Sequence, residues 1–316
     1  MIYTLTLNPA LDYLVNLESL IPGSTNRSIG ETIIWGGKGI NVSRVLFNLG
    51  FDSVTLGFIA GFTGEALKKG LLALGLRTDF IELERGLTRI NVKVKAKEET
   101  EINGSGPLVS LEAIETLMNK VAKLNKGDTL IMAGNIPPNV GQDIYERLLV
   151  SQAGHGVRVV IDTSGPALKR VLKHQPTLVK PNINELNEIC DKKALSDDQI
   201  IENAKRLQEM GAQNVLVSMA GAGALLVQSN GQSHRVKSAQ GQVKNSAGAG
   251  DSLVAGFLAG LMWDLPPEGA LALGAAAGSA TAFSEGLASR EAIEAIYKET
   301  YGLSLPIELS KPLNIL

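Results

Sequence analysis

Cysteine and histidine are scarce in this chain of 316 residues, which has one cysteine, Cys190, and three histidines. One cysteine excludes a disulfide within the chain, and the wide separation of the histidines argues against a His/Cys zinc site. Thirty basic against 32 acidic residues give a net charge of −2, so no overall positive field exists to hold nucleic acid or an anionic membrane. We therefore expect a protein of the reducing cytoplasm that binds neither nucleic acid nor a membrane.

Long apolar runs are also missing. The most apolar run, residues 253–263, is shorter than the ~20 residues of a membrane-spanning helix, so it predicts a buried helix. Hydrophobic residues nevertheless make up 44% of the chain, enough to fill a core, which argues against disorder. The length allows two domains or one large α/β domain with an elaboration. Residues 1–7 lack the pattern of a signal peptide and predict a first strand.

Short apolar strands alternate with amphipathic helices along the chain. A helix is expected over 111–124, where apolar residues recur at three- and four-residue steps, and another between Ser196 and Gly211. Strands are expected at 53–58, 128–133, 157–162, 177–180 and 214–218. Repeated strand, helix, strand order requires crossover connections, which predicts an α/β fold with a doubly wound, mostly parallel sheet flanked by helices.

Two segments, about 11–35 and 87–102, are β-rich and contain no helix. Within the second, apolar and polar residues alternate strictly from 88 to 97, which is typical of a half-exposed strand. We expect these segments to form a small sheet that stands as a lid over the carboxyl ends of the core strands, within one domain spanning residues 1–316.

Glycine is abundant, with 34 residues, and it clusters where backbone could approach a ligand closely. Gly37 and Lys38 are followed by Gly39, where a P-loop needs serine or threonine, so Walker chemistry is excluded. Each GxG pair lacks the third glycine of the dinucleotide fingerprint, which disfavours a dehydrogenase.

Residues 245–257 (NSAGAGDSLVAGF) predict a tight glycine turn that enters an apolar helix near Ala249. Free N–H groups at such a helix end, together with the helix dipole, form a site for an anion such as a phosphate. Asp251 would lie in the first turn, where it could accept a proton from an attacking hydroxyl. The alternative is an aspartate that only complements the dipole.

Other segments carry weaker signals of the same kind. Residues 35–46 predict a glycine turn feeding a helix, with Lys38 and Asn41 turned to a ligand, or else an ordinary loop. Asn182 and Glu185 share a helical face and could hold hydrated Mg²⁺, although plain helix capping is the stronger interpretation. Residues 218–224 could admit a purine ring or form a simple hairpin.

Taken together, these motifs resemble the ribokinase/PfkB family of carbohydrate kinases over nearly the whole chain. The resemblance rests on five motifs in the family's order: TLNPALD at 6–12, GGKGINVSRVL at 36–46, TRINVK at 88–93, KPNINE at 180–185 and NSAGAGDSLVAGF at 245–257. It implies the ribokinase-like α/β fold with a β lid. Two departures are visible: Ala220 stands where the family's nucleotide loop has its first glycine, and 133–137 reads AGNIP instead of SGSLP.

The resemblance also implies roles for individual residues. Asp251 would be the catalytic base, and the backbone of Gly248, Ala249 and Gly250, with Ala247, would form the anion hole. The implied substrate contacts are Asp12, Gly37, Lys38, Asn41 and Asn135, joined by Arg27 and Arg89 because arginine binds phosphate in a bidentate fork. The implied nucleotide contacts are Asn182, Glu185, Ser218, Gly221 and Gly223, with Glu185 as the Mg²⁺ residue.

The activity that the resemblance implies is ATP-dependent, Mg²⁺-requiring phosphorylation of D-fructose 1-phosphate at its C6 hydroxyl. Tagatose 6-phosphate, fructose 6-phosphate or an unphosphorylated sugar are alternative acceptors, and a catalytically silent sugar- or nucleotide-binding regulator is the alternative from another class. A homodimer formed through the lid is expected, because open β lids have exposed edges.

Overall fold

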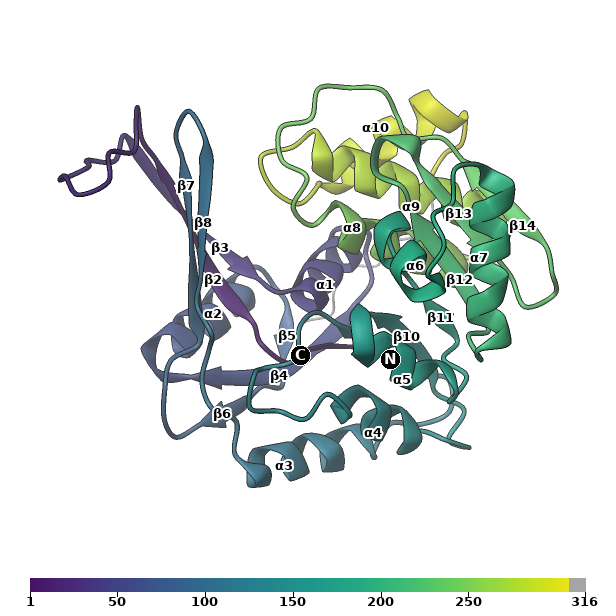
Figure 1. Ribbon diagram of the computed structural model, residues 1–316, viewed down its shortest axis with the longest axis horizontal. Coiled ribbons are helices and arrows are strands. Elements are labelled where there is room, and N and C mark those ends of the chain that lie inside the picture. The colour runs from purple at the N-terminus through teal and green to yellow at the C-terminus, as the bar shows by residue number, and fades with distance from the viewer. Residues whose placement is uncertain (307–316) are drawn as a thin grey trace.

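The computed structural model describes residues 1–306, which contain one large and one small β-sheet (Figure 1). The large sheet has ten strands. Its order is β14 (Ser233–Val236), β13 (Ala224–Val227), β12 (Asn214–Ser218), β11 (Leu178–Val179), β10 (Arg158–Asp162), β9 (Thr129–Ala133), β1 (Ile2–Thr6), β4 (Ser53–Ala60) and β5 (Arg77–Thr78), and β6 (Ile81–Leu83) also pairs with β4. All neighbours pair in parallel except β12 with β13 and β13 with β14.

Helices cover both faces of the large sheet, as a doubly wound fold requires. One buried cluster joins the sheet to α3 (Leu111–Val121), α4 (Ile144–Val150), α5 (Gly165–Leu172), α6 (Ile183–Cys190) and α7 (Asp197–Glu209). A second cluster joins the opposite face to α1 (Lys38–Asn48), α8 (Ala249–Met262), α9 (Pro267–Ala282) and α10 (Arg290–Tyr301). A third packs α2 (Gly61–Ala73) against Leu11 and Ile40.

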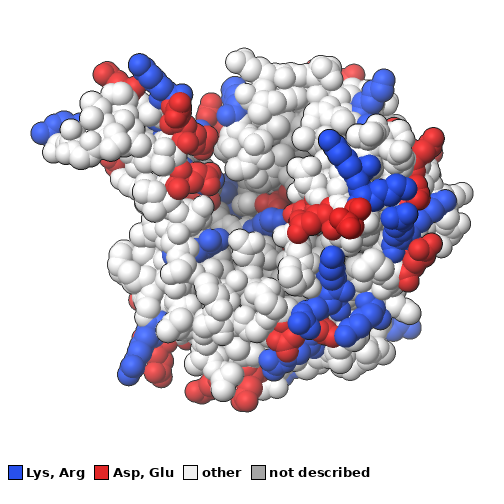
Figure 2. All heavy atoms as spheres, in the orientation of Figure 1, with Lys and Arg blue, Asp and Glu red and all other residues white. Residues whose placement is uncertain are grey.

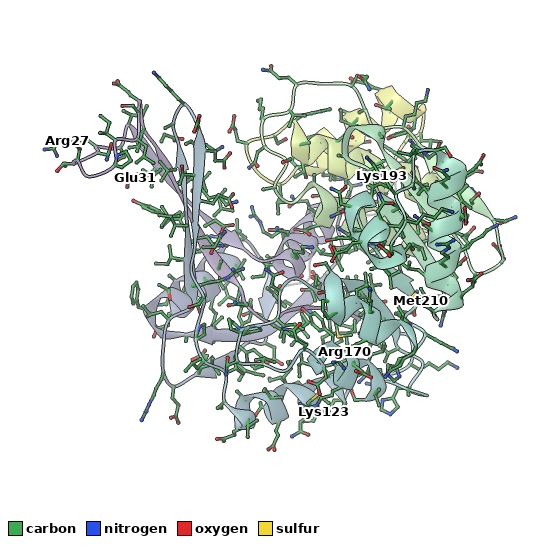
Figure 3. All side chains as sticks on the ribbon, viewed as in Figure 1. Arg27, Glu31, Lys123, Arg170, Lys193 and Met210 are labelled. Carbon is green, nitrogen blue, oxygen red and sulfur yellow. The ribbon has the colours of Figure 1, made fainter. Side chains whose placement is uncertain are left out.

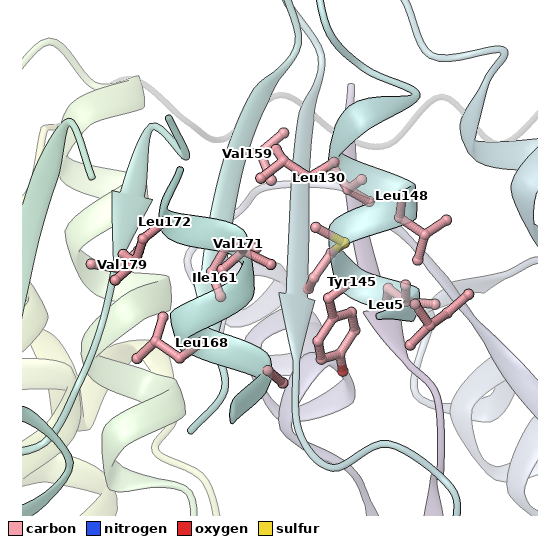
Figure 4. Close-up of a cluster of buried hydrophobic side chains, with 14 of the residues drawn as sticks. Leu5, Leu130, Tyr145, Leu148, Val159, Ile161, Leu168, Val171, Leu172 and Val179 are labelled. Carbon is pink, nitrogen blue, oxygen red and sulfur yellow. The ribbon is translucent and has the colours of Figure 1, made fainter. Parts of the chain in front are cut away.

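Alternating strand residues supply the two cores. Val159 and Ile161 of β10 point to the α3–α7 face, where they meet Leu130, Tyr145 and the apolar side of α5 (Figure 4). Val160, between them, belongs to the α8–α9 face. Every central strand is thus buried on both faces, which is why these strands read as continuous apolar runs in the sequence.

The small sheet stands apart from the large one (Figure 1) and has the order β3 (Gly30–Gly36), β2 (Ala10–Asn16), β7 (Arg89–Lys95), β8 (Glu99–Asn103). Its central pair, β2 with β7, is parallel, and both outer pairs are antiparallel. Asp12, Asn91 and Asn103 line up across one face, whereas Ile33, Tyr13, Val92 and Ile102 line up across the other. The sheet therefore has a polar and an apolar face.

The predicted architecture is confirmed, with differences in detail. The strands expected at 53–58, 128–133, 157–162, 177–180 and 214–218 are β4, β9, β10, β11 and β12, and the run 253–263 lies in the buried helix α8. The helix after the glycine turn begins at Lys38, directly after Gly37, so Gly39 is helical. Among the described residues, no helix is both long and apolar enough to cross a bilayer.

Candidate active site

Several strands of the large sheet end where three of the predicted motifs meet. In open parallel sheets this carboxyl edge is where ligands bind, because loops and helix starts converge there. On the face shown in Figure 2, both signs of charge are dispersed, and basic and acidic atoms appear in a hollow between the small sheet and the rest of the molecule. Two of the motifs are joined directly by a hydrogen bond.

That hydrogen bond involves Asp251, in the first turn of α8. Its Oδ2 accepts from Asn41 Nδ2 of α1 at 2.8 Å, and the residue is only 5% exposed. Burial, followed by the negative charge of Asp162, raises the pKa of Asp251 to about 6, although Asn41, Lys180 and Lys38 act in the opposite direction. A carboxylate with such a pKa is ionised at neutral pH and is a better proton acceptor than an ordinary aspartate.

The turn before α8 offers fewer free amides than the sequence predicts. The Ala247 N–H donates to Asn245 Oδ1 at 3.0 Å, and the Ala249 N–H donates to the Ser246 carbonyl at 3.3 Å. The amides of Gly248 and Gly250 have no acceptor within residues 1–306. The anion hole expected from 247–250 is therefore narrowed to these two glycines, because folding of the turn uses the other two amides.

Gly37, the residue before α1, has a backbone conformation that only glycine adopts readily. Its φ is 138°, and a Cβ there would lie 2.7 Å from Thr6 Cγ2. The turn therefore lies directly on the end of β1, and Lys38 and Asn41 follow it at the start of the helix. This placement brings the predicted substrate-binding motif to the same edge as Asp251.

Lys38 forms an ion pair that the sequence does not reveal. Its Nζ lies 3.0 Å from Oδ1 of Asp162, the last residue of β10, and Lys180 Nζ lies 3.1 Å from Oδ2 of the same carboxylate. Asp162 is fully buried and Lys180 nearly so. Burial acts to raise the pKa of Asp162, but the two ammonium groups outweigh it and the net direction is down.

Asp162 and Lys180 were therefore missed as members of the site. Asp162 could have been found as an acidic residue at the carboxyl end of a predicted parallel strand, which is where ligand-binding side chains gather. Lys180 opens the KPNINE motif, but its burial beside Asp162 depends on the pairing of β10 with β11.

The small sheet contributes Asp12 and Arg89 from its polar face. Asp12 Oδ1 accepts from Asn91 Nδ2 at 2.8 Å, and a Cβ on Gly36 would lie 2.6 Å from Asp12 Oδ2. Arg89 Nε donates to the Asn8 carbonyl at 3.1 Å. Both residues lie on the polar face near the β2 end that adjoins β1, so they can reach a substrate held below the small sheet.

Arg27 is not brought to this cluster. It lies at the outer tip of the small sheet, on the connection between β2 and β3 (Figure 3). The two strands carry this connection away from Asp251 of the same chain, and the expected contact of Arg27 with the substrate stays a prediction. Asn135 is exposed and follows Gly134, whose neighbour across the turn is the Lys38 side chain.

Asn182 and Glu185 form the capping box that is the alternative to a metal role. Asn182 Oδ1 accepts from the amides of Asn184 and Glu185, each at 2.9 Å, and Glu185 Oε2 accepts from the Asn182 amide at 2.8 Å. The other Glu185 oxygen has no protein partner among the described residues. Helix capping and Mg²⁺ binding are therefore compatible with each other, since Glu185 uses one carboxylate oxygen as a cap and keeps the other for a ligand.

A preformed metal cage is absent from residues 1–306, where no group of three or more His, Cys, Asp or Glu side chains is arranged to hold an ion. Mg²⁺ in kinases characteristically keeps several waters and takes only one or two carboxylates besides substrate phosphates. A single available Glu185 oxygen beside the site fits that donor set.

The predicted nucleotide loop forms a hairpin between β12 and β13, with the short helix η1 (Ala220–Ala222) at its tip. Ser218 forms a bridge with Asn182, so this loop adjoins the KPNINE segment. Gly223 has φ +97°, and a Cβ there would lie 2.2 Å from the Val236 carbonyl oxygen, so glycine is required. Ala220 has φ 47°, a left-handed conformation in which glycine is less strained.

Comparison with known proteins identifies the family to which this fold and site belong. Residues 6–293 match the pfkB family of carbohydrate kinases, and the chain belongs to that family. It is 45% identical to a 1-phosphofructokinase of Bacillus subtilis over 95% of this chain and 98% of that protein. It is 38% identical to a D-tagatose-1-phosphate kinase of Bacillus licheniformis over 91% and 94%.

Among solved structures, the tetrameric inhibited form of phosphofructokinase-2 from Escherichia coli superposes with a TM-score of 0.87 at 29% identity, covering 95% of this chain and 98% of that one. The family assignment implies that ATP is the second substrate of this kinase. The roles of individual site residues stay predictions.

Proposed function

We propose that this protein transfers the γ-phosphoryl group of ATP to the C6 hydroxyl of D-fructose 1-phosphate and produces D-fructose 1,6-bisphosphate. The observation that carries the proposal is the buried carboxylate of Asp251 at the start of α8. It accepts a hydrogen bond from Asn41 of α1 and lies beside the two glycine amides that have no acceptor. The identity of 45% to a 1-phosphofructokinase over nearly the whole chain supports the choice of acceptor.

Asp251 acts as the general base in this proposal. The acceptor hydroxyl gives its proton to the carboxylate while its oxygen attacks the γ-phosphorus, and the bond from that phosphorus to the β–γ bridging oxygen breaks, releasing ADP. The Asn41 amide donates to Oδ2 and so leaves Oδ1 to receive the proton. The proton then passes to solvent when the product leaves.

Negative charge on the transferred group is met by groups that folding has already placed. The Gly248 and Gly250 amides point from the start of α8, where the helix dipole adds a partial positive charge. Lys180 is the adjacent full charge, since a Cβ on Gly250 would lie 3.2 Å from its Nζ. Glu185, with Asn182, would hold Mg²⁺, which when bound supplies charge neutralisation to the ATP phosphates.

The acceptor side is formed by the α1 turn and the small sheet. Asp12, Gly37, Lys38 and Asn41 would hold the sugar, and Arg89 would bind its phosphate, because a guanidinium binds phosphate through paired N–H groups. The small sheet acts as a lid of the single kinase domain: its closure over the sugar excludes water and so limits hydrolysis of ATP. Ser218, Gly221 and Gly223 would line the nucleotide end.

The protein acts as a homodimer in this proposal, with the apolar faces of two small sheets packed together. Ile33 and Ile102, in one row across that face, are 49% and 62% exposed, which is unusual for large apolar side chains unless something covers them. The related phosphofructokinase-2 is described as having a tetrameric form.

A panel of acceptors tests the function. With ATP and Mg²⁺, release of ADP should be fastest with D-fructose 1-phosphate, and ³¹P NMR should show the second phosphate on C6. D-tagatose 1-phosphate belongs in the panel, because a relative named for that substrate is 38% identical and the two sugars share a phosphate at C1. Preference for a 6-phosphate sugar would reassign the substrate, and ADP release with none of them would favour a silent binding protein.

The base is tested separately by Asp251→Asn, which keeps the shape and can still accept from Asn41. We expect kcat to fall by ~10²–10⁴ with little change in either KM. Glu291→Gln is the matched control, because Glu291 also lies in the first turn of a helix, but it is exposed and its helix, α10, carries no predicted site residue. Turnover within a factor of two of the unsubstituted enzyme in Asp251→Asn would contradict the assignment.

A further inference from the structure

Asp162 is a fully buried carboxylate to which the proposed mechanism gives no role. It ends β10, and its two oxygens face two different lysines, Lys38 at 3.0 Å and Lys180 at 3.1 Å. Taking a carboxylate out of water costs several kcal/mol unless charged partners compensate it. The ionised Asp251 also acts on both lysines, so two ammonium groups and two carboxylates are gathered at this point, and Asp162 is the one that lies within ion-pair distance of both lysines.

The two lysines come from opposite sides of the site. Lys38 begins α1, inside the glycine turn that also carries Asn41, and its stem lies against Gly134 at the end of β9. Lys180 follows β11 and reaches the Gly250 turn at the start of α8. One carboxylate therefore fixes a cation on the acceptor side and a cation on the phosphoryl-donor side.

Neither lysine forms an ion pair with another carboxylate among the described residues. A lysine side chain has a long flexible stem, and holding its ammonium at one place costs conformational entropy. With Asp162 neutral, Lys38 would be free to turn toward solvent, since its side chain is already 38% exposed, whereas Lys180, at 6%, would be left as a buried charge facing only Asp251.

We propose that Asp162 is a positioning residue for phosphoryl transfer, which holds Lys38 against the acceptor sugar and Lys180 against the transferred phosphoryl group at the same time. The proposal rests on the kinase function proposed above, because it assigns the two lysines to the two substrates of that reaction. Asp162 touches neither substrate and acts only through the lysines.

The charge of Asp162 also affects the pKa of Asp251, the proposed base. The charged groups that face Asp251 are Lys38 from α1, Asp162 from β10 and Lys180 after β11. The remaining helix packed on α8 is α9, whose one charged residue, Glu268, lies at the opposite end of the helix pair. Removing the Asp162 charge leaves the two lysines unopposed, so the pKa of Asp251 should fall.

The experiment compares Asp162→Asn with Lys38→Met and Lys180→Met, using ATP and the best acceptor of the panel. Lys38→Met should raise KM chiefly for the phosphosugar, and Lys180→Met should raise KM chiefly for ATP. Asp162→Asn should raise both, lower kcat by about tenfold or more, and move the acid limb of the kcat/KM profile to lower pH by about one unit. Asp128→Asn, at the far end of the large sheet, is the control and should behave as the unsubstituted enzyme.

Three outcomes would overturn the proposal: unchanged KM values in Asp162→Asn, an unmoved acid limb, or recovery of kcat by raised Mg²⁺, which would make Asp162 a metal residue instead. If Asp162→Asn does not fold, the double variant Asp162→Asn/Lys180→Met removes the charge together with one counter-charge. Its KM for the phosphosugar then decides the question, because Lys38 has lost Asp162, and an unchanged value would overturn the proposal. Absence of turnover in the unsubstituted enzyme would count against the proposed function, whereas normal turnover in Asp162→Asn would count against this inference alone.

Discussion

Asp251 carries a charge in a place where charge is unfavourable to the fold. Its carboxylate is nearly inaccessible, and burial raises its pKa to about 6 against an ordinary value of 3.8. In the unfolded chain the group would ionise at the ordinary value. The folded state therefore binds its proton more tightly, and the protein loses stability as the pH rises from about 4 to 6, with the full loss present above pH 6.

Replacing Asp251 by asparagine should therefore stabilise the fold, even though the same substitution is expected to lower kcat. Below about pH 4 both states hold the proton, so Asp251→Asn should leave the free energy of unfolding almost unchanged. As pH rises through 4 to 6 the native protein loses stability and the variant does not, and above pH 6 the variant should be more stable by about 1–3 kcal/mol. Urea unfolding at pH 4.5 and pH 8 measures this. An equal difference at both pH values would show that Asp251 carries no such cost.

At the level of single residues, sequence reasoning identified the side chains that meet in the site but not the charges that hold them. Asp251, Asn41 and Lys38 were found because each lies in a motif with a glycine turn. Asp162 was not, because nothing in the strand 157–162 distinguishes its last residue until β10 is placed between β9 and β11. The position of Arg27 could not be predicted either: an arginine in a β-rich segment indicates a phosphate contact, but not that the strands carry it to the outer tip of the small sheet.

At the level of elements, α8 links the core to the chemistry. Its first turn supplies Asp251 and the glycine amides, and its body packs along α9 through glycines on both helices. A Cβ on Gly256 would lie 2.7 Å from the Leu273 carbonyl oxygen and 2.9 Å from Gly274 Cα, so the backbones are in contact. Any larger residue at Gly256 must push the two helices apart and so displace the glycine turn at the start of α8.

Gly256→Ala should therefore destabilise the protein by about 1–3 kcal/mol and lower kcat, even though alanine is the better helix former. Gly269→Ala is the matched control on the partner helix, because its added Cβ would have no neighbour nearer than 3.6 Å. That variant should keep its activity and its stability. Thermal unfolding and steady-state kinetics on both variants check the prediction, and loss of activity in Gly269→Ala to the same extent would refute it.

The helices and strands that the sequence predicts accurately are those set by residues close together in the chain, such as a capping serine or a short apolar run. The strand expected at 214–218 has those bounds, and the helix from Ser196 ends before Gly211, with the Ser196 side chain accepting from the Gln199 amide. The small sheet was predicted as two β-rich segments, but its parallel pairing of β2 with β7 was not. That register joins strands separated by two helices and is set by packing, which no local pattern encodes.

At the scale of the whole molecule, the small sheet has two faces of different polarity. Its polar face carries Asp12 and Arg89, which are predicted substrate contacts, while the row of Ile33, Tyr13, Val92 and Ile102 lies on the opposite face. The inner end of this face, at Leu11 and Trp35, packs on α2, whereas its outer part, with Ile33 and Ile102, is exposed. The apolar face of the small sheet in a second copy of the chain is a surface of matching polarity that could cover these exposed side chains.

Ile33→Lys/Ile102→Lys should therefore convert a dimer into a monomer, because it places two charges on the proposed contact where each would be desolvated on association. The control is Leu195→Lys, which adds a charge at a still more exposed apolar residue, just before α7 and outside the small sheet. Sedimentation equilibrium should give twice the chain mass for the unsubstituted protein and for Leu195→Lys, and the chain mass for the double variant. A dimer that survives in Ile33→Lys/Ile102→Lys, or an unsubstituted protein that is monomeric at micromolar concentration, would exclude association through this face.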